Sequence, residues 1–225
     1  MKKHFVWLIV FVVVFADQAL KYYVKTHFLL NTAVPIFGDW FQLFFVENPG
    51  MAYGWKFGGN WGKLTLTIFR LCAVIFGVYY LIKINNNKYH KGFVICVGLI
   101  FAGALGNLID SCFYGLMFDK GMIYNPNYFE YLGYEGLASF SGKGYGSFLH
   151  GNVVDMLYFP VLRGTFPDWV PGWGGQDFEF FRPIFNIADA AISSGVIILI
   201  LFQKRFFPMT EETDVIVEEQ PENLQ

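Results

Sequence analysis

Four apolar segments, each close to the length that a helix needs to cross a bilayer, constrain this sequence more than any other feature. A transmembrane helix takes about 20 mostly apolar residues. The chain has such runs over about 5–24, 64–82, 93–109 and 184–202. Its composition is 55% hydrophobic and only 15% charged, which is unusual for a soluble domain. We therefore expect a membrane protein with an all-α core of four transmembrane helices.

Basic residues predict the orientation of these helices. With four spans, all of the following lie on one side: Lys2, Lys3, the loop 83–91, Lys204 and Arg205. An excess of Lys and Arg marks the cytoplasmic side of a membrane protein. Both termini are then cytoplasmic, and the long connections 25–63 and 113–183 face outward.

The first apolar run also has features of a secretory signal peptide, because two lysines precede it. Asp17, Gln18 and Lys21 follow it, however, where a signal peptide would carry a small-residue cleavage site. We expect an uncleaved membrane helix.

The two outer connections differ in pattern. Residues 25–63 alternate aromatic and polar side chains between turn residues, which predicts short strands at the membrane surface. Residues 113–183 are rich in Tyr, Phe, Gly and Trp, which favours an irregular flap or interfacial helix resting on the membrane. Residues 1–205 thus form one membrane unit, and the acidic tail 206–225 is expected to be a disordered cytoplasmic segment.

Polar residues within the apolar runs recur at helical spacing. Three pairs lie three or four residues apart: Asp17 with Lys21, Asn107 with Asp110, and Asn186 with Asp189. Residues at these spacings share one helix face. The first pair is expected to neutralise itself as an ion pair, and the amide of Asn186 is expected to bind the Asp189 carboxylate. Ionisable residues inside a membrane are candidates for a functional site.

Asp155 is the candidate partner of Asp189. It lies between apolar neighbours, Val154 and Met156 among them, which would draw it into an apolar pocket. Two carboxylates in such a pocket do not both ionise cheaply, so they share a proton. This is the chemistry of an aspartic protease, in which one carboxylate takes a proton from water and the other polarises the scissile carbonyl. The alternative is an exposed loop carboxylate.

Other chemistries have little support in the sequence. The four histidines lack the HExxH pattern, no GxSxG elbow occurs, and Cys72, Cys96 and Cys112 lack CxxC spacing. We expect no metal and no organic cofactor. A net charge of −2 gives no basic footprint for nucleic acid. Arg70, within the second run, could extend to the membrane surface, pair with an acid or meet substrate.

Five motifs follow one another along the chain: Asp17-x-x-x-Lys21, NPGMAYG at 48–54, GALGNLID at 103–110, VVD at 153–155 and FNIAD at 185–189. With these motifs the chain resembles the lipoprotein signal peptidases, or signal peptidase II, of bacteria. The resemblance covers about residues 5–203 and leaves out much of the second outer connection.

The resemblance implies an aspartic endopeptidase that removes signal peptides from prolipoproteins by cutting before a diacylglyceryl-modified cysteine. It implies four membrane helices, a small extracytoplasmic β-cradle and an extracytoplasmic flap loop or helix that clamps the substrate. The location would be the bacterial cytoplasmic (inner) membrane, with the site near its outer face. The family is inhibited by the peptide globomycin, and a monomer is expected because the site is complete in one chain.

The motif positions also imply roles for individual residues. Asp155 and Asp189 look like the catalytic dyad. The residues that order the site would be Asn107, Asp110 and Asn186. Positions that the family uses for structure or substrate binding are Asp17, Lys21, Asn48 and Gly50.

The sequence departs from the family pattern at two places. The family usually has Arg after the third-run aspartate, where this chain has Ser111, so Arg70, Arg163 and Arg182 are candidates for the missing cation. The segment 111–150 is also longer than the compact pattern needs. It would narrow substrate choice, bind a partner or be a tolerated surface insertion.

Two other functions remain open at this stage. A small transporter or channel subunit would use Asp17, Lys21, Asp110 and Asp189 as an ion path and would not need Asp155. A non-catalytic scaffold that binds lipidated peptides would need neither Asp155 nor Asp189.

Overall fold

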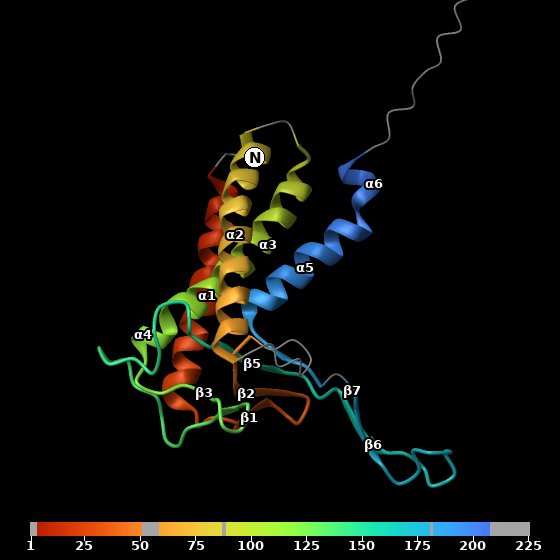
Figure 1. Cartoon of the computed structure of the whole chain (residues 1–225). Helices are drawn as coiled ribbons and strands as arrows, with labels where there is room; N and C mark the ends of the chain where they lie inside the picture. The colour runs from red at the N-terminus through yellow and green to blue at the C-terminus, as the bar shows by residue number, and fades with distance from the viewer. Residues whose placement is uncertain (1–3, 51–58, 87–88, 181, 208–225) are drawn as a thin grey trace, which may run out of the picture.

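Three long helices form the body of the molecule, which is described here from a computed structural model over residues 4–50, 59–86, 89–180 and 182–207. They are α1 (Phe5–His27), α2 (Gly59–Asn86) and α3 (Lys91–Ile109). The three helices stand beside one another in Figure 1. The central one is α3, which packs against α1, α2 and the later helix α5 (Ile187–Leu201).

The long helices have the length and surface of membrane spans. After Ile109, α3 continues through a π-helical turn, η1 (Asp110–Tyr114), into the short α4 (Gly115–Met117). The helices over Phe5–His27, Trp61–Asn86 and Lys91–Met117 are long and apolar enough to cross a membrane. Their outward side chains are apolar and large, with Phe15 65% exposed and Phe69 70% exposed. Such extended apolar surfaces suit contact with lipid.

The fourth expected span is shorter than the sequence suggested. The prediction of a helix from residue 184 was wrong, because Ile184 and Phe185 form strand β8 and α5 covers only 15 residues. At 1.5 Å per residue α5 is about 22 Å long, less than the roughly 30 Å of a hydrocarbon core. It packs along α3, slants relative to α1 and α2, and leads into α6 (Gln203–Phe206) (Figure 1).

A four-stranded antiparallel sheet lies at one end of the helices. Its order is β1 (Ala33–Phe37), β2 (Phe41–Asn48), β5 (Val153–Tyr158), β8. Strands β1 and β2 confirm the short strands expected in the first outer connection. The pairing of β2 with β5 places Val46 opposite Asp155.

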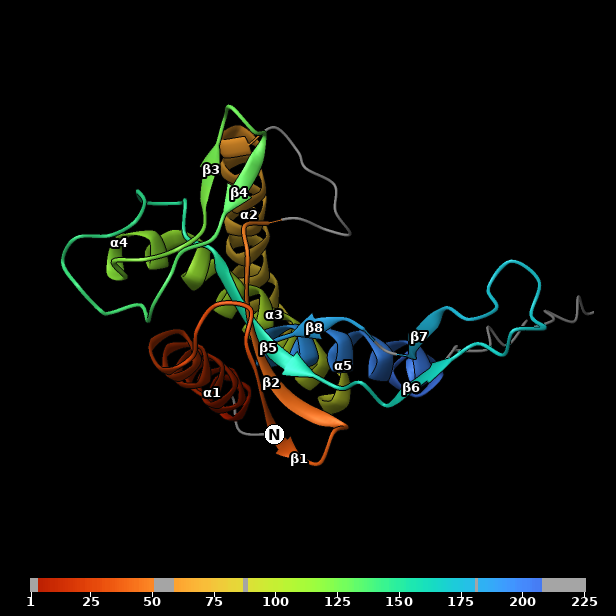
Figure 2. The same ribbon diagram turned by 90° about the horizontal axis from the view of Figure 1, so that it is seen from below.

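The second outer connection forms strands where we expected an irregular flap or interfacial helix. The described residues between Met117 and α5 contain no helix. Besides β5 and β8 they form two hairpins, β3 (Ile123–Asn125) with β4 (Glu130–Leu132) and β6 (Leu162–Thr165) with β7 (Asp177–Phe180). Figure 2 shows the first hairpin over α2 and the second reaching away from the rest of the molecule.

Two apolar clusters hold the sheet and the helices in place. One lies among α1, α2 and α3 and includes Val10, Val74 and Phe101. The other joins α1 to the sheet and includes Phe45 and Met156, both fully buried. Strand β5 packs into this second cluster through Val154 and Met156. The side chains of β5 are therefore held in fixed positions relative to the helices.

Candidate functional site

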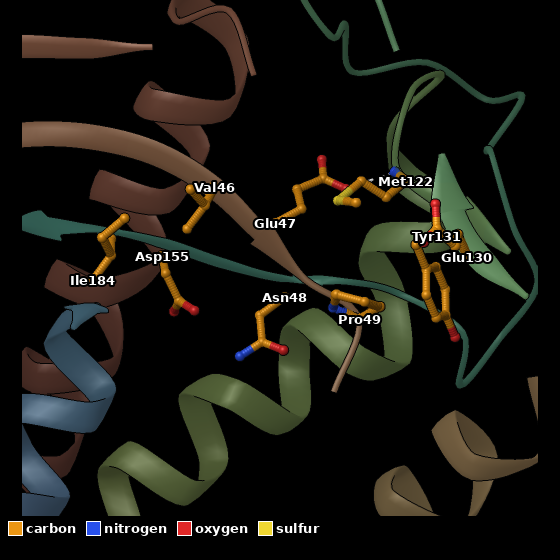
Figure 3. A pocket seen from close by; sticks show the side chains of 9 residues that line it. All are labelled: Val46, Glu47, Asn48, Pro49, Met122, Glu130, Tyr131, Asp155 and Ile184. Carbon is orange, nitrogen blue, oxygen red and sulfur yellow. Dashed lines mark hydrogen bonds between the residues drawn. The ribbon is translucent and has the colours of Figure 1, made fainter. Parts of the chain in front are cut away.

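Asp155 lies in the middle of β5 and is almost fully buried. Its residue is 5% exposed, and its neighbours Val154 and Met156 are fully buried. The apolar surroundings that the sequence indicated are therefore present, and the alternative of an exposed loop carboxylate is wrong. Figure 3 shows the side chain of Asp155 at the edge of a pocket that also includes Asn48.

Asp189 lies in the first turn of α5, where Asn186 caps the helix. The Asn186 Oδ1 atom accepts a hydrogen bond from the Asp189 backbone amide at 2.9 Å, and the Asp189 Oδ2 atom accepts one from the Asn186 backbone amide at 3.3 Å. This reciprocal arrangement is a capping box. We expected the side-chain amide of Asn186 to bind the Asp189 carboxylate. Instead backbone amides hold both side chains, which leaves the Asn186 NH₂ group for other partners.

Two asparagine side chains link the carboxylates of Asp155 and Asp189. Asn186 Nδ2 donates to Asp155 Oδ1 at 2.6 Å and to Asn107 Oδ1 at 3.1 Å. Asn107 Nδ2 in turn donates to Asp189 Oδ1 at 2.8 Å. A chain of hydrogen bonds from α5 and α3 thus fixes the rotamers of both carboxylates.

Burial and the neighbouring charge change the acidity of Asp155. The pKa of its carboxyl is raised to about 7, first because it is buried and second because the negative charge of Asp189 lies close to it. Both effects disfavour ionisation of Asp155. Below about pH 7 the site therefore holds mainly a carboxylic acid beside a second carboxyl group.

Lys21 neutralises two buried aspartates behind this pair. Its Nζ atom lies 2.8 Å from a carboxylate oxygen of Asp17 and 2.8 Å from one of Asp110. The ion pair expected between Asp17 and Lys21 is confirmed. Lys21 also donates to Asn107 Oδ1 at 2.9 Å, which directs the NH₂ group of Asn107 toward Asp189. Asp110 therefore faces Lys21 and the supporting network.

Close contacts between α3, α1 and α5 bring the side chains around Lys21 close to the carboxylate of Asp189. A Cβ atom on Gly103 would lie 2.1 Å from the Ala188 carbonyl oxygen, and one on Gly106 would lie 2.7 Å from Asp17 Oδ2. Asp17 Oδ1 also accepts a hydrogen bond from the Ala188 amide at 2.9 Å. Small residues thus allow the helix approach that places Asp189 against Asn107.

Asn48 and Gly50 lie at the end of β2, beside the pocket. Asn48 Oδ1 accepts a hydrogen bond from the Gly50 amide at 2.9 Å. Gly50 has a φ of 101°, a conformation that favours glycine. Asn48 lines the same pocket as Asp155. The rest of this motif, residues 51–54, lies outside the described part of the chain.

Arg70 lies closest to Ser111 among the three arginines considered for the missing cation. Its Nη1 atom donates to Ser111 Oγ at 2.9 Å, and its charge interacts with those of Asp155 and Asp189. Arg163 and Arg182 instead lie near Glu179, away from this network, at 3.6 and 3.8 Å from its carboxylate.

Sequence reasoning missed several buried or half-buried polar residues of this region. Gln18 donates to Asp110 Oδ1 at 2.8 Å. Glu47 forms an ion pair with Lys25 in which both side chains are fully buried. The signal for Lys25 was available, because it follows Lys21 by four residues and so shares its helix face. Strand alternation also offered a signal for Glu47, because it shares a strand face with the buried Leu43 and Phe45.

The site offers acid–base chemistry by carboxyl groups. Within the described ranges, no three His, Cys, Asp or Glu side chains are grouped in a way that could hold a metal ion. What the arrangement provides is one protonated carboxyl group and a second carboxyl group held by amides. Such a pair activates water and polarises a carbonyl group at the same time.

Comparisons with known proteins agree with this chemistry. Residues 9–205 match a family model described as signal peptidase (SPase) II. The lipoprotein signal peptidase of Porphyromonas gingivalis is 43% identical over 190 residues, which are 84% of this chain and 78% of that protein. The lipoprotein signal peptidase of Amoebophilus asiaticus is 36% identical over 190 residues, 82% of this chain and 71% of that protein.

Solved structures of bacterial membrane enzymes have a similar fold. One aligns with a TM-score of 0.57 and 24% identity over 92% of each chain. Another aligns with a TM-score of 0.54 and 25% identity, over 88% of this chain and 91% of the other.

Proposed function

Because this chain belongs to the signal peptidase II family, we propose that Asp155 and Asp189 are the catalytic pair of an aspartic endopeptidase. The observation that carries the proposal is the position of Asn186, which caps the helix of Asp189 and donates to Asp155 Oδ1 at 2.6 Å. One residue thereby fixes both carboxyl groups, as a reaction that uses them together requires.

The reaction follows from the different environments of the two carboxyl groups. Asp155, with its raised pKa, carries the proton and donates a hydrogen bond to the carbonyl oxygen of the scissile peptide. Asp189 accepts a proton from a water molecule whose oxygen attacks the carbonyl carbon. The tetrahedral intermediate then breaks at its C–N bond as a proton moves to the leaving nitrogen. The products are a new carboxylate and a new amine, and no covalent bond to the protein forms.

The remaining residues of the network position this pair. Asn107 and Asn186 hold the carboxylates directly. The charges behind them, Asp17, Lys21 and Asp110, set the orientation of Asn107 through the Lys21 ammonium.

Asn48, Gly50 and Arg70 are the candidates for contact with substrate. Asn48 lines the pocket at Asp155, and Gly50 fixes the turn beside it. Arg70, on α2, brings a positive charge near Asp155 and Asp189. It contacts Ser111, which stands where the family pattern has an arginine. We assign to Arg70 the part of that missing cation.

The substrate we propose is a prolipoprotein whose cysteine already carries diacylglycerol. The site lies where the long apolar helices meet the sheet. Acyl chains in the bilayer would hold the scissile bond at this level without extraction of the lipid. The distribution of basic residues supports an orientation in which this end lies at the outer face of the inner membrane and both termini are cytoplasmic. We propose residues 1–205 as the peptidase unit, and a monomer because the residues of the site come from one chain. An inhibitor such as globomycin would bridge the two carboxyl groups.

The lipid requirement gives the test of this function. We expect the purified protein to cut a diacylglyceryl-modified precursor peptide directly before the cysteine, and to cut the same peptide without the lipid at least about 100-fold more slowly, because the lipid supplies the positioning. Mass spectrometry of the products identifies the cleaved peptide bond, and the amount of product over time gives the cleavage rate. Cleavage of neither peptide by folded protein would contradict the proposal and favour an ion path or a scaffold. Equal rates on both peptides would contradict the substrate class.

A further inference from the structure

A pocket of about 490 Å³ lies between strand β5, which carries Asp155, and the β3–β4 hairpin (Figure 3). One wall comes from β2, the turn after it, β5 and β8: Val46, Glu47, Asn48, Pro49, Asp155 and Ile184. The facing wall comes from Met122, Glu130 and Tyr131. These three belong to the segment 111–150, which is longer than the family pattern needs. The additional segment therefore forms part of the cavity that contains Asp155.

Both ends of the hairpin are fixed to the buried carboxylate of Glu47. The Met122 amide, just before β3, donates to Glu47 Oε2 at 2.8 Å. The Tyr134 hydroxyl, just after β4, donates to Glu47 Oε1 at 2.9 Å. Asn152 Nδ2 links Glu47 to the start of the hairpin, because it donates to Glu47 Oε2 at 2.7 Å and to the Met122 carbonyl oxygen at 2.9 Å.

Glu47 in turn lies on the strand that pairs with β5, the strand of Asp155. It lies on β2 opposite Val154, directly beside the pair of Val46 with Asp155. Its ion pair with Lys25 of α1 is fully buried. Burial of two charges costs several kcal/mol per ion unless further hydrogen bonds satisfy them, as they do here. An insertion that merely covered the surface would not need this arrangement, so the hairpin has a defined position relative to Asp155.

Tyr131 is the hairpin residue whose ring is held at the pocket. The Lys63 Nζ atom of α2 lies 5.7 Å from the centre of this ring. The ring of Tyr124, on the paired strand β3, lies 5.3 Å from it. Contacts on two sides thus hold an aromatic side chain in the wall of the cavity, on the hairpin side in Figure 3. Such rigid aromatic residues are typical anchors for a bound peptide.

We propose that the β3–β4 hairpin binds the mature segment of the precursor, the residues that directly follow the lipidated cysteine. This inference rests on the proposed function. The signal peptide and the acyl chains occupy the membrane, whereas the mature segment leaves it. The pocket fits that segment because it lies outside the long apolar helices and its lining combines apolar side chains, such as Met122 and Ile184, with the polar groups of Glu47, Asn48 and Glu130. Tyr131 is then a specificity-determining residue.

The test compares two diacylglyceryl-modified precursors, one that ends at the lipidated cysteine and one that continues for six residues beyond it. We expect the wild-type protein to have a higher kcat/KM for the longer precursor. Tyr131→Ala should reduce the ratio of the two kcat/KM values about tenfold, which is the size of effect for removal of an aromatic anchor. Tyr128→Ala is the matched control, because Tyr128 lies in the same hairpin, is 70% exposed and does not line the pocket.

The outcomes separate this inference from the function on which it rests. A changed ratio in Tyr131→Ala, with the wild-type ratio in Tyr128→Ala, supports the inference. If the wild-type protein cuts both precursors equally well, or if Tyr131→Ala slows both by the same factor, the hairpin does not bind the mature segment. If the wild-type protein cuts neither precursor, the proposed function itself fails, and the inference fails with it.

Discussion

Asp155→Asn and Asp189→Asn are each expected to lower kcat for cleavage of a lipidated precursor by about 10³- to 10⁴-fold. Asparagine keeps the size of the side chain but neither gives nor takes the proton that the reaction moves. In Asp155→Asn the side-chain oxygen can still accept from Asn186, and in Asp189→Asn the one remaining oxygen can still accept from Asn107, so KM should change little. The measurement is the initial rate of cleavage over a range of precursor concentrations.

Asp168→Asn provides the control for these two variants. Asp168 is an exposed aspartate of the segment between β6 and β7, so the same chemical change there should leave kcat at the wild-type value. The elution profile and melting temperature of each variant show whether it is folded. A folded Asp155→Asn protein with near-normal kcat would remove Asp155 from the catalytic pair.

Lys21→Met is expected to cause the largest loss of stability. The Lys21 side chain is fully buried and pairs with both Asp17 and Asp110 at 2.8 Å. Removal of one partner from a buried ion pair costs about 3–5 kcal/mol, because the remaining charge has no compensation. For a chain of this size the melting temperature should fall by roughly 10 °C. Tryptophan fluorescence during heating in detergent measures it.

A double variant separates the charge effect from lost packing. Lys21→Met with Asp110→Asn should melt at a higher temperature than Lys21→Met alone, because it leaves one buried charge fewer. Lys204→Met changes an exposed lysine of α6 and should melt like the wild type. A double variant no more stable than the single one would show that the charge balance at Lys21 is not what stabilises this region.

The sequence predicted the long apolar helices, the ion pair of Asp17 with Lys21 and the burial of Asp155, because these features depend on local patterns. The four-residue spacing of Asp17 and Lys21 gave the ion pair that the structure has. The apolar neighbours of Asp155 indicated its burial, which is complete but for a small fraction. These features follow from one helix or one strand at a time.

Features that depend on partners distant in the chain were not predicted. The start of α5 was placed too early, because Ile184 and Phe185 read as part of an apolar run and their pairing with β5 is not visible in it. The spacing of Asn186 and Asp189 suggested a side-chain contact, whereas the helix cap gives both groups backbone partners. The burial of Glu47 depends on Lys25, Tyr134 and Asn152, which lie on three separate segments.

We expect Asp155 to hold a proton up to about pH 7 because it is buried and lies beside Asp189, and the proposed reaction depends on this proton. An aspartate with a raised pKa remains protonated from low pH up to its own pKa, here about 7, and loses the proton above it. The infrared C=O band of a protonated carboxylic acid reports this state directly. It should be recorded against pH for the wild type, Asp155→Asn and Asp189→Asn.

We predict a carboxylic acid band in the wild-type protein that disappears as the pH rises through about 7. The difference spectrum should show that Asp155→Asn lacks this band. In Asp189→Asn the band should titrate at lower pH, because the neighbouring negative charge is gone while the burial remains. A band that persists in Asp155→Asn with the intensity and titration of the wild type would place the proton on another carboxyl group and contradict the account.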